Sequence, residues 1–377
     1  MRLPTDDQHD LRSACRTVLA AHSTSPHLRA VAESPGRFDA ALYRLVSGLG
    51  WTALTVPQTH GGLGLGLVDA GIVAEELGRV VHGGPLAHTL GAAALIDRYA
   101  QDSMRDLILP QIAEGSATVA LGTDRGMAIP GTGLTLLPVA EPAQGQAYQL
   151  DGRLDWVANA AVATHLLLAA NLDGECRAVL IEARVVQVEP MRSVDLTCEH
   201  GRVTAAAVLV PADAVLAAPS GDTLFDVAVM LQCAESVGIA SRLLDMTVEY
   251  ARQRVQFGQP IGKFQAVKHK LADMLVAREA ARACTWEAAG QLDDDALRAA
   301  EAVSVAKSIA GAAGSDVASQ ALQIHGGIGF TWEHDLHLFL RRAKINELLL
   351  GSPSWHEERL TALLESTSLI DLGPSIH

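Results

Sequence analysis

The sequence has few aromatic side chains and few basic ones. Phenylalanine, tryptophan and tyrosine make up 4% of its 377 residues, and 29 lysines and arginines stand against 43 aspartates and glutamates, for a formal net charge of −14. We expect no nucleic-acid partner, because phosphate backbones require clustered basic residues. At 49% hydrophobic residues, the chain is too apolar for disorder and long enough for two or three packed domains.

Cysteines and long apolar runs are also scarce. The five cysteines are scattered without metal-ligand spacing, so we expect no metal site and a reduced, cytoplasmic location. Apolar runs such as 166–170 and 205–210 fall far short of the ~20 residues of a spanning helix. Residues 1–10 are polar and acidic. The sequence therefore predicts neither a signal core nor a membrane span.

Three segments with different patterns follow one another. Apolar residues recur at helical spacing across 1–115, short runs rich in valine, leucine and threonine alternate with turns across 116–217, and long helical patterns return across 218–377. In the middle segment, Asp151-Gly152 between two such runs predicts a hairpin turn. Long helices joined by short loops predict a bundle. The expected fold class is mainly α with a central β domain.

Residues 250–274, YARQRVQFGQPIGKFQAVKHKLADM, combine groups that suit a phosphate-bearing ligand. A helix is expected to end near Arg254, whose guanidinium can fork onto phosphate oxygens. Phe257 offers a flat ring, and Gly258 lets a ligand approach the backbone. Taken alone, the same residues also fit the commoner case of a helix–turn–helix corner with a solvated arginine.

Residues 323–345, QIHGGIGFTWEHDLHLFLRRAKI, contain a second candidate site. Gly326 and Gly327 follow a long helical pattern and can form a nest of backbone amides that faces an anion. Gln323 is a natural partner for a ribose or an amide edge. Taken alone, a glycine cap at a helix end explains the same pattern. It is not a Rossmann fingerprint, because no strand precedes it.

Together these segments resemble the signatures of the acyl-CoA dehydrogenase family, and the resemblance covers nearly the whole chain. Residues 254–274 are similar to its R-x-QFG…FQ…ADM signature, 323–330 to its Q-x-x-GG-x-GF signature, and 51–64 to its N-terminal WxxLxxPxxxGGxG block. The resemblance implies an N-terminal helical domain, a middle β domain and a C-terminal four-helix bundle.

The resemblance also implies the chemistry. An acyl-CoA thioester would lose a proton from Cα and a hydride from Cβ to FAD, and an electron-transfer flavoprotein or a similar acceptor would reoxidise the flavin. In the family, the matching residues reach across a dimer to the adenosine-pyrophosphate end of the neighbouring FAD. A homo- or hetero-oligomer, dimeric or tetrameric, is therefore implied, and the resemblance assigns the FAD contacts to Arg254, Phe257, Gly258, Gln323, Gly326 and Gly327.

The sequence departs from the family at the glutamate that removes the Cα proton. The two positions where family members carry this base correspond to Leu350 and Ala228, and neither is acidic. Glu235 is seven residues from Ala228, and we do not expect it to point to the base position, although it stays a candidate base because it lies in an apolar run. For Glu347 we expect a salt-bridged surface role, and for Glu333 a structural role near a helix start.

The middle segment is altered as well. Residues 121–133 keep almost nothing of the Thr-Glu-Pro…Gly-Ser-Asp loop with which the family holds flavin and acyl-CoA. By contrast, residues 154–159 resemble the family's tryptophan-containing strand, with Trp156 and Asn159 in place. Trp156 either stacks near a flavin or fills the core of a small β domain.

Residues 332–343, WEHDLHLFLRRA, are similar to heteromeric acyl-CoA dehydrogenases of sterol side-chain catabolism. In those assemblies one subunit brings the base and the other completes the cofactor site. The first hypothesis is therefore a subunit that completes a shared FAD site with a glutamate-bearing partner. Two others stay open: a self-sufficient homo-oligomer with an unorthodox base such as Glu235, and a non-catalytic scaffold.

Overall fold

The computed structural model describes residues 3–126, 131–139 and 146–371 and confirms the expected fold class. Thr5 begins the first helix with a capping box, in which the Gln8 N–H donates to Thr5 Oγ1 at 3.3 Å and the Thr5 N–H donates to Gln8 Oε1 at 3.1 Å. The N-terminal part is helical, with α1 (Asp6–His22), α2 (Ser25–Glu33), α3 (Ala40–Gly48), α4 (Leu67–Gly78), α5 (Leu86–Tyr99) and α6 (Asp102–Ala113).

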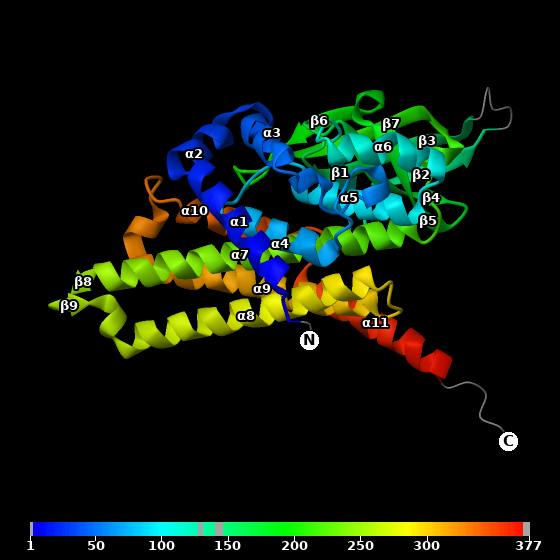
Figure 1. Cartoon of the computed structure of the whole chain (residues 1–377). Coiled ribbons are helices and arrows are strands. Elements are labelled where there is room, and N and C mark those ends of the chain that lie inside the picture. Colours follow the sequence, from blue (N-terminus) through cyan, green and yellow to red (C-terminus); the bar gives the residue numbers. More distant parts are fainter. Residues whose placement is uncertain (1–2, 127–130, 140–145, 372–377) are drawn as a thin grey trace, which may run out of the picture.

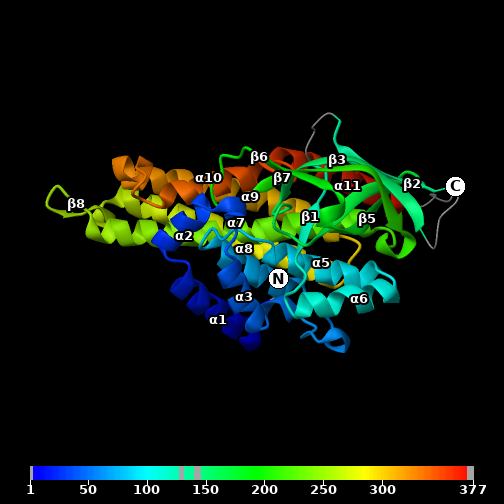
Figure 2. The same cartoon turned by 90° about the horizontal axis from the view of Figure 1, so that it is seen from above.

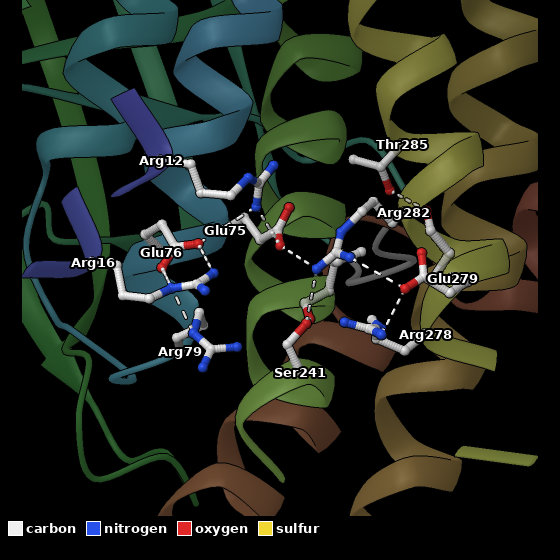
Figure 3. A network of polar contacts seen from close by, with 12 residues as sticks. Arg12, Arg16, Glu75, Glu76, Arg79, Ser241, Arg278, Glu279, Arg282 and Thr285 are labelled. Carbon is white, nitrogen blue, oxygen red and sulfur yellow. Dashed lines mark hydrogen bonds and ion pairs between the residues drawn. The ribbon is translucent and has the colours of Figure 1, made fainter. Parts of the chain in front are cut away.

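Ion pairs with two buried glutamates of α4 hold α1 against α4 (Figure 3). Glu75 and Glu76 of α4 are each 1% exposed. Arg12 Nη1 lies 2.7 Å from Glu75 Oε1, and Arg16 Nη2 lies 2.7 Å from Glu76 Oε1. From α8 (Gln265–Asp293), Arg282 Nη2 reaches Glu75 Oε1 at 2.6 Å. Burial raises the pKa of Glu75, but the two guanidiniums outweigh it and hold the pKa below its usual value.

The middle part is a β sheet. Its strands pair in the order β1-β4-β2-β3-β7-β6, and β5 pairs with β4. The pairs β1–β4 and β2–β4 are parallel, and the other pairs of this sheet are antiparallel among the described residues. The strands are β1 (Val119–Gly122), β2 (Gly133–Pro138), β3 (Gln146–Ala158), β4 (His165–Leu172), β5 (Glu175–Glu182), β6 (Gln187–Met191) and β7 (His200–Pro211). In the altered loop 121–133, residues 127–130 lie outside the described residues.

The hairpin predicted at Asp151-Gly152 is wrong. β3 continues through both residues, and its pairing with β7 shifts register between Leu150 and Gly152. Gly152 has a φ of 118°, and a Cβ there would lie 2.2 Å from the carbonyl oxygen of Gly133 on β2. Glycine at this position therefore allows a bulge and a close approach of two strands instead of a turn.

The C-terminal part is a helical bundle. α7, α8 and α9 pack on one another. α10 and α11 both pack on α9 and together take the place of a fourth helix. By length and hydropathy α7 could span a membrane, but 83% of its apolar window is buried inside the protein, so it is the central core helix. The remaining elements are α7 (Ser220–Gln253), β8 (Val255–Gln256), β9 (Gln259–Pro260), α9 (Ala299–His325), the 3₁₀ helix η7 (Gly326–Phe330), α10 (Leu336–Leu348) and α11 (Pro353–Asp371).

α7 connects two distant regions of the molecule. The N-terminal helices and the sheet lie beside each other along the bundle, and the sheet is near the first turns of α7 (Figure 1). The β8–β9 hairpin projects from the opposite end of the bundle, far from the sheet, in both Figure 1 and Figure 2. The residues predicted to be functional fall into these two regions.

Candidate functional site

The β8–β9 hairpin presents the first predicted group. The Arg254 N–H donates to the Tyr250 carbonyl at 2.8 Å and ends α7. Phe257 (φ 53°) and Gly258 (φ 76°) then form a two-residue turn of the type I′ kind. Phe257 is 92% exposed, and a Cβ on Gly258 would meet nothing within 4 Å. The Phe257 ring meets the Phe264 ring edge to face with centroids 6.2 Å apart and otherwise faces solvent, as does the backbone turn at Gly258.

The glycine turn after α9 presents the second group. Gly326, with φ of 63°, ends the helix, and its N–H donates to the Leu322 carbonyl. A Cβ on Gly326 or Gly327 would meet nothing within 4 Å, whereas one on Gly329 would lie 3.0 Å from Leu322 Cδ1. Packing inside the chain thus explains the glycine at 329 but not the one at 327, where the backbone is left open for an external group.

Aromatic side chains connect the last turn of α7 to the end of α9. The rings of Tyr250, in the last turn of α7, and His325, the last residue of α9, stack with centroids 4.5 Å apart. The Tyr250 hydroxyl also donates to the His325 carbonyl at 3.3 Å. Within the described part of the chain, the exposed guanidinium of Arg254 has no hydrogen-bond or ion-pair partner. A free guanidinium fork and open glycine amides are both groups that suit an anion such as pyrophosphate.

A cavity near the other end of α7 gathers the remaining predicted residues. Its volume is about 100 Å³, and Trp156, Ala228, Glu235 and Leu350 all contribute to its wall. Glu235 lies on the same face of α7 as Ala228, contrary to the expectation that it would point elsewhere. The reason is that a spacing of seven residues is close to two full helical turns.

Trp156 belongs to the cavity wall and is not a plain core residue. It is partly exposed, and its ring meets that of His200 edge to face with centroids 5.8 Å apart. Trp156 and Asn159 both have positive φ, at 63° and 61°. The Asn159 amide donates to the Gly84 carbonyl at 3.1 Å, which ties this end of β3 to the N-terminal helical part. The backbone at Trp156 therefore has a conformation that residues other than glycine rarely adopt, and this conformation places the ring at the cavity.

Both carboxylate oxygens of Glu235 are engaged. The Asn346 amide donates to Glu235 Oε2 at 2.8 Å, and the Arg342 guanidinium forms an ion pair with Oε1. Arg342 is 3% exposed and also pairs with Asp195, which is 0% exposed, and donates to Thr197 Oγ1 at 2.7 Å. Burial alone would lower the pKa of Arg342, but the two carboxylates outweigh it and raise that pKa. The cavity floor is thus a closed carboxylate–guanidinium–carboxylate cluster.

The backbone at Leu350 is held from behind the cavity. The buried Lys307 ammonium donates to the Asn346 carbonyl and to the Leu349 carbonyl at 2.8 Å, and so caps the end of α10. Burial lowers the pKa of Lys307 to about 8. The His356 ring donates to the Leu350 carbonyl at 2.8 Å. Leu350 itself has a φ of 60°, and its apolar side chain contributes to the cavity wall at a position where the resemblance led us to expect the base.

Histidines complete the cavity, and sequence reasoning missed them. His82, His88 and His200 contribute to its wall from three separate segments. Burial lowers the pKa of each to about 4, so the rings are neutral at pH 7. No motif joins these residues in the sequence, and only the packing of the sheet against the helices brings them together.

Glu347 forms the ion pair expected for it, and Glu333 lies away from the cavity. Glu347 pairs with Lys344 at 3.0 Å, one turn earlier on α10. Glu333 is exposed in the turn before α10, away from the cavity wall. Neither contributes to the cavity.

The two regions are too far apart to hold one small molecule within a single chain. Ala228 and Arg254 lie on the same straight helix, about 39 Å apart at a rise of 1.5 Å per residue. The hairpin and the glycine turn therefore form a candidate site separate from the cavity of the same chain.

The comparisons with known proteins agree with these motifs. The family model described as "Acyl-CoA dehydrogenase, N-terminal domain" matches residues 5–116, and the C-terminal domain model matches residues 222–362. The acyl-CoA dehydrogenase IpdE2 of Mycolicibacterium smegmatis is 33% identical over 360 residues, which cover 95% of this chain and 99% of that protein.

Solved structures agree in fold over nearly the full length. A variant of the Tcur3481-Tcur3483 steroid ACAD is 30% identical with a TM-score of 0.88 and covers 97% of this chain and 99% of its own. The ChsE4-ChsE5 complex from Mycobacterium tuberculosis is 26% identical, with the same TM-score and coverage. The chain therefore belongs to the acyl-CoA dehydrogenase family, whose members are FAD-dependent oxidoreductases acting on the CH–CH group of acyl-CoA thioesters.

Proposed function

We propose that this chain is the acyl-CoA dehydrogenase subunit that completes a shared FAD site with a glutamate-bearing partner. One observation carries the proposal. The residues that would serve a neighbour's FAD are exposed and open. By contrast, the chain's own cavity is small, has the Glu235–Arg342 ion pair in its wall and has apolar side chains at both expected base positions.

The hairpin and the glycine turn fit the pyrophosphate and adenosine end of FAD. Arg254 has a free guanidinium for phosphate oxygens, and the open backbone at Gly326 and Gly327 lets amides approach an anion. Phe257 offers a ring face, and Gln323 is exposed on the last turn of α9. When bound, FAD accepts the hydride from the substrate. The role of these residues in this chain is to bind and orient the cofactor's far end.

The chain's own cavity does not fit a flavin ring together with an acyl group. A volume of about 100 Å³ is well below the ~300–1,000 Å³ of ordinary ligand pockets. Charge is a second obstacle. Negative charge develops on the thioester during α-proton removal, and enzymes stabilise it with aimed donors. Here Arg342 already faces two carboxylates, so the cluster carries excess negative charge and has no cation to spare.

Glu235 is poorly placed to act as the base, although it contributes to the cavity wall. A general base needs a free oxygen directed at the proton that it removes. Both oxygens of Glu235 already accept hydrogen bonds, from Asn346 and from Arg342. Breaking the ion pair between Glu235 and Arg342 would leave the buried Arg342 guanidinium with Asp195 as its single carboxylate partner in the cluster. Removing one partner of a buried ion pair is costly. The self-sufficient hypothesis would require that rearrangement in every catalytic cycle.

The likeness to a steroid ACAD suggests the substrate class. The Tcur3481-Tcur3483 protein is called a steroid ACAD and resembles this chain over 97% of its length. We therefore propose a steroid-derived acyl-CoA as the substrate of the assembled enzyme, with an electron-transfer flavoprotein or a similar protein as acceptor.

Co-expression with a glutamate-bearing homologue tests the proposal. We expect the lone chain to reduce no electron acceptor with steroid-type or straight-chain acyl-CoA thioesters, and the complex to be active with one FAD for each pair of chains. Glutamine in place of the partner's glutamate should abolish activity, and Glu235→Gln should not. An active lone chain that Glu235→Gln inactivates would establish the self-sufficient enzyme. A complex whose FAD content and activity are unchanged by Arg254→Ala would establish the scaffold.

A further inference from the structure

Three aromatic rings lie directly behind the two groups assigned to FAD. Tyr250 stacks on His325 with an angle of 21° between the ring planes, and His334 meets His325 edge to face with centroids 4.8 Å apart. Tyr250 is four residues before Arg254, and His325 immediately precedes Gly326. The ring stack of Tyr250, His325 and His334 is therefore the contact between the last turn of α7 and the end of α9, where the hairpin and the glycine turn begin.

The hydrogen bonds of the two histidines require neutral rings. His325 Nδ1 donates to the Ala321 carbonyl at 2.8 Å, and its other nitrogen, Nε2, is buried without a partner in the described part of the chain. A proton on Nε2 would thus be a buried N–H with no acceptor. His334 Nδ1 accepts the Leu336 N–H at 3.2 Å at the start of α10, so a proton there would remove that acceptor. Protonation of either ring breaks the arrangement.

No neighbouring carboxylate is free to stabilise a protonated His325 or His334 ring in the described part of the chain. His325 is 4% exposed, and the groups packed around it are the neutral Tyr250 and the His334 ring. Asp335 is the acid nearest to His334 along the chain, but it already pairs with Arg29 at 2.6 Å. Burial lowers the pKa of both histidines from the ordinary value of 6.5. Both rings are therefore neutral at pH 7 and resist protonation until the stack opens.

We propose that the ring stack is a positioning device that couples the Arg254 hairpin to the glycine turn, and that acid opens it and releases the far end of FAD. The sign follows from the geometry. An opened stack takes up protons near the ordinary histidine pKa of 6.5, and the closed stack takes them up only at lower pH. The closed form is thus fully favoured above pH 6.5 and loses stability as the pH falls below it. This inference rests on the proposed far half of the FAD site.

The rate of FAD release from the flavin-loaded oligomer tests the coupling. Flavin fluorescence after dilution would report release between pH 8.0 and pH 5.5, and circular dichroism at each pH would show that the chain stays folded. We expect release from the unmodified protein to be several-fold faster at pH 5.5 than at pH 8.0, because over this range the opened stack takes up protons and the closed stack takes up fewer.

Four variants separate the roles of the rings. His325→Phe keeps a stacked ring without titration, and His334→Asn keeps an acceptor for the Leu336 N–H, so each should flatten the pH profile with release at pH 8.0 within about threefold of the unmodified protein. Tyr250→Leu should accelerate release at every pH, because it removes the stack. His22→Gln, on the exposed end of α1, is the matched control and should leave the profile unchanged.

The outcomes distinguish this inference from the proposed function. If Arg254→Ala does not change FAD release at pH 8.0, the assignment of the far half-site is wrong and the coupling is wrong with it. If Arg254→Ala accelerates release while His325→Phe and His334→Asn keep the unmodified pH profile, the half-site stands and only the ring stack is refuted. A flat profile in the unmodified protein refutes the ring stack as well.

Discussion

Replacing Arg342 by methionine is the strongest perturbation that the structure allows away from the proposed FAD contacts. Arg342 is 3% exposed and faces Asp195, which is 0% exposed, and Glu235. Methionine fills a similar volume but leaves two buried carboxylates without their shared counter-charge. Removing one partner of a buried ion cluster destabilises proteins by about 3–5 kcal/mol. At an unfolding entropy of ~2.1 cal/mol/K per residue, this corresponds to a fall in Tm of roughly 4–6 °C.

The loss should depend on pH in a defined direction. Without Arg342, the folded variant keeps two carboxylates near each other with no counter-charge. Protonation would remove that charge, so we expect the destabilisation to be largest at neutral pH and to shrink as the pH falls. Denaturant unfolding at pH 7.5 and pH 5.0 would measure both values.

The matched control is Arg184→Met. Arg184 also forms an ion pair with a glutamate, Glu182, but its side chain is 80% exposed. We expect no measurable change in the free energy of unfolding, because exposed pairs contribute little. If Arg342→Met destabilises the chain no more than Arg184→Met, or by the same amount at both pH values, Arg342 does not compensate the buried charges of Asp195 and Glu235.

Three further outcomes are expected. Arg254→Ala should weaken FAD binding to the assembled enzyme by roughly 1.5–3 kcal/mol, the range for a charge-assisted contact, with an unchanged Tm; equal FAD affinity would contradict the assignment. Gly327→Ala should fold normally because a Cβ there meets nothing within 4 Å, yet it should reduce FAD retention, whereas Gly48→Ala, equally open but on α3, should not. Arg12→Ala should destabilise the chain by about 1–3 kcal/mol, since Glu75 loses one of its two arginines, and urea unfolding would detect it.

The sequence predicted those features that short local motifs determine. The end of α7 at Arg254 and the glycine turn at Gly326 follow from short motifs in which one or two residues decide the backbone conformation. The same local reasoning failed at Asp151-Gly152, where two strands approach each other closely and the glycine serves a bulge. A dipeptide typical of turns cannot reveal which strand will lie beside it.

The closed cavity could not be predicted, because its parts are distant in sequence. Asp195 follows β6, Glu235 lies in the middle of α7, and Arg342 lies on α10. Each resembles an ordinary surface charge until packing buries it. Of these features, the sequence could have predicted only that Glu235 and Ala228 lie on the same face of α7, because a spacing of seven residues is close to two helical turns. The stack of Tyr250 on His325 is likewise a tertiary contact between two helix ends.

The apolar side chain of Leu350 and the cluster at Arg342 contribute to the wall of the same cavity. Lys307 and His356 still hold the backbone around Leu350, so a glutamate there would project into a cavity wall that already contains Glu235. Its charge would add to Asp195 and Glu235 against the single Arg342 guanidinium, and like charges at such distances raise one another's pKa. The cavity would also remain near 100 Å³, too small for an acyl group beside a flavin. If the proposed function is right, we therefore expect Leu350→Glu alone to give the lone chain no acyl-CoA dehydrogenation, because the cavity stays small and its charge balance becomes more negative.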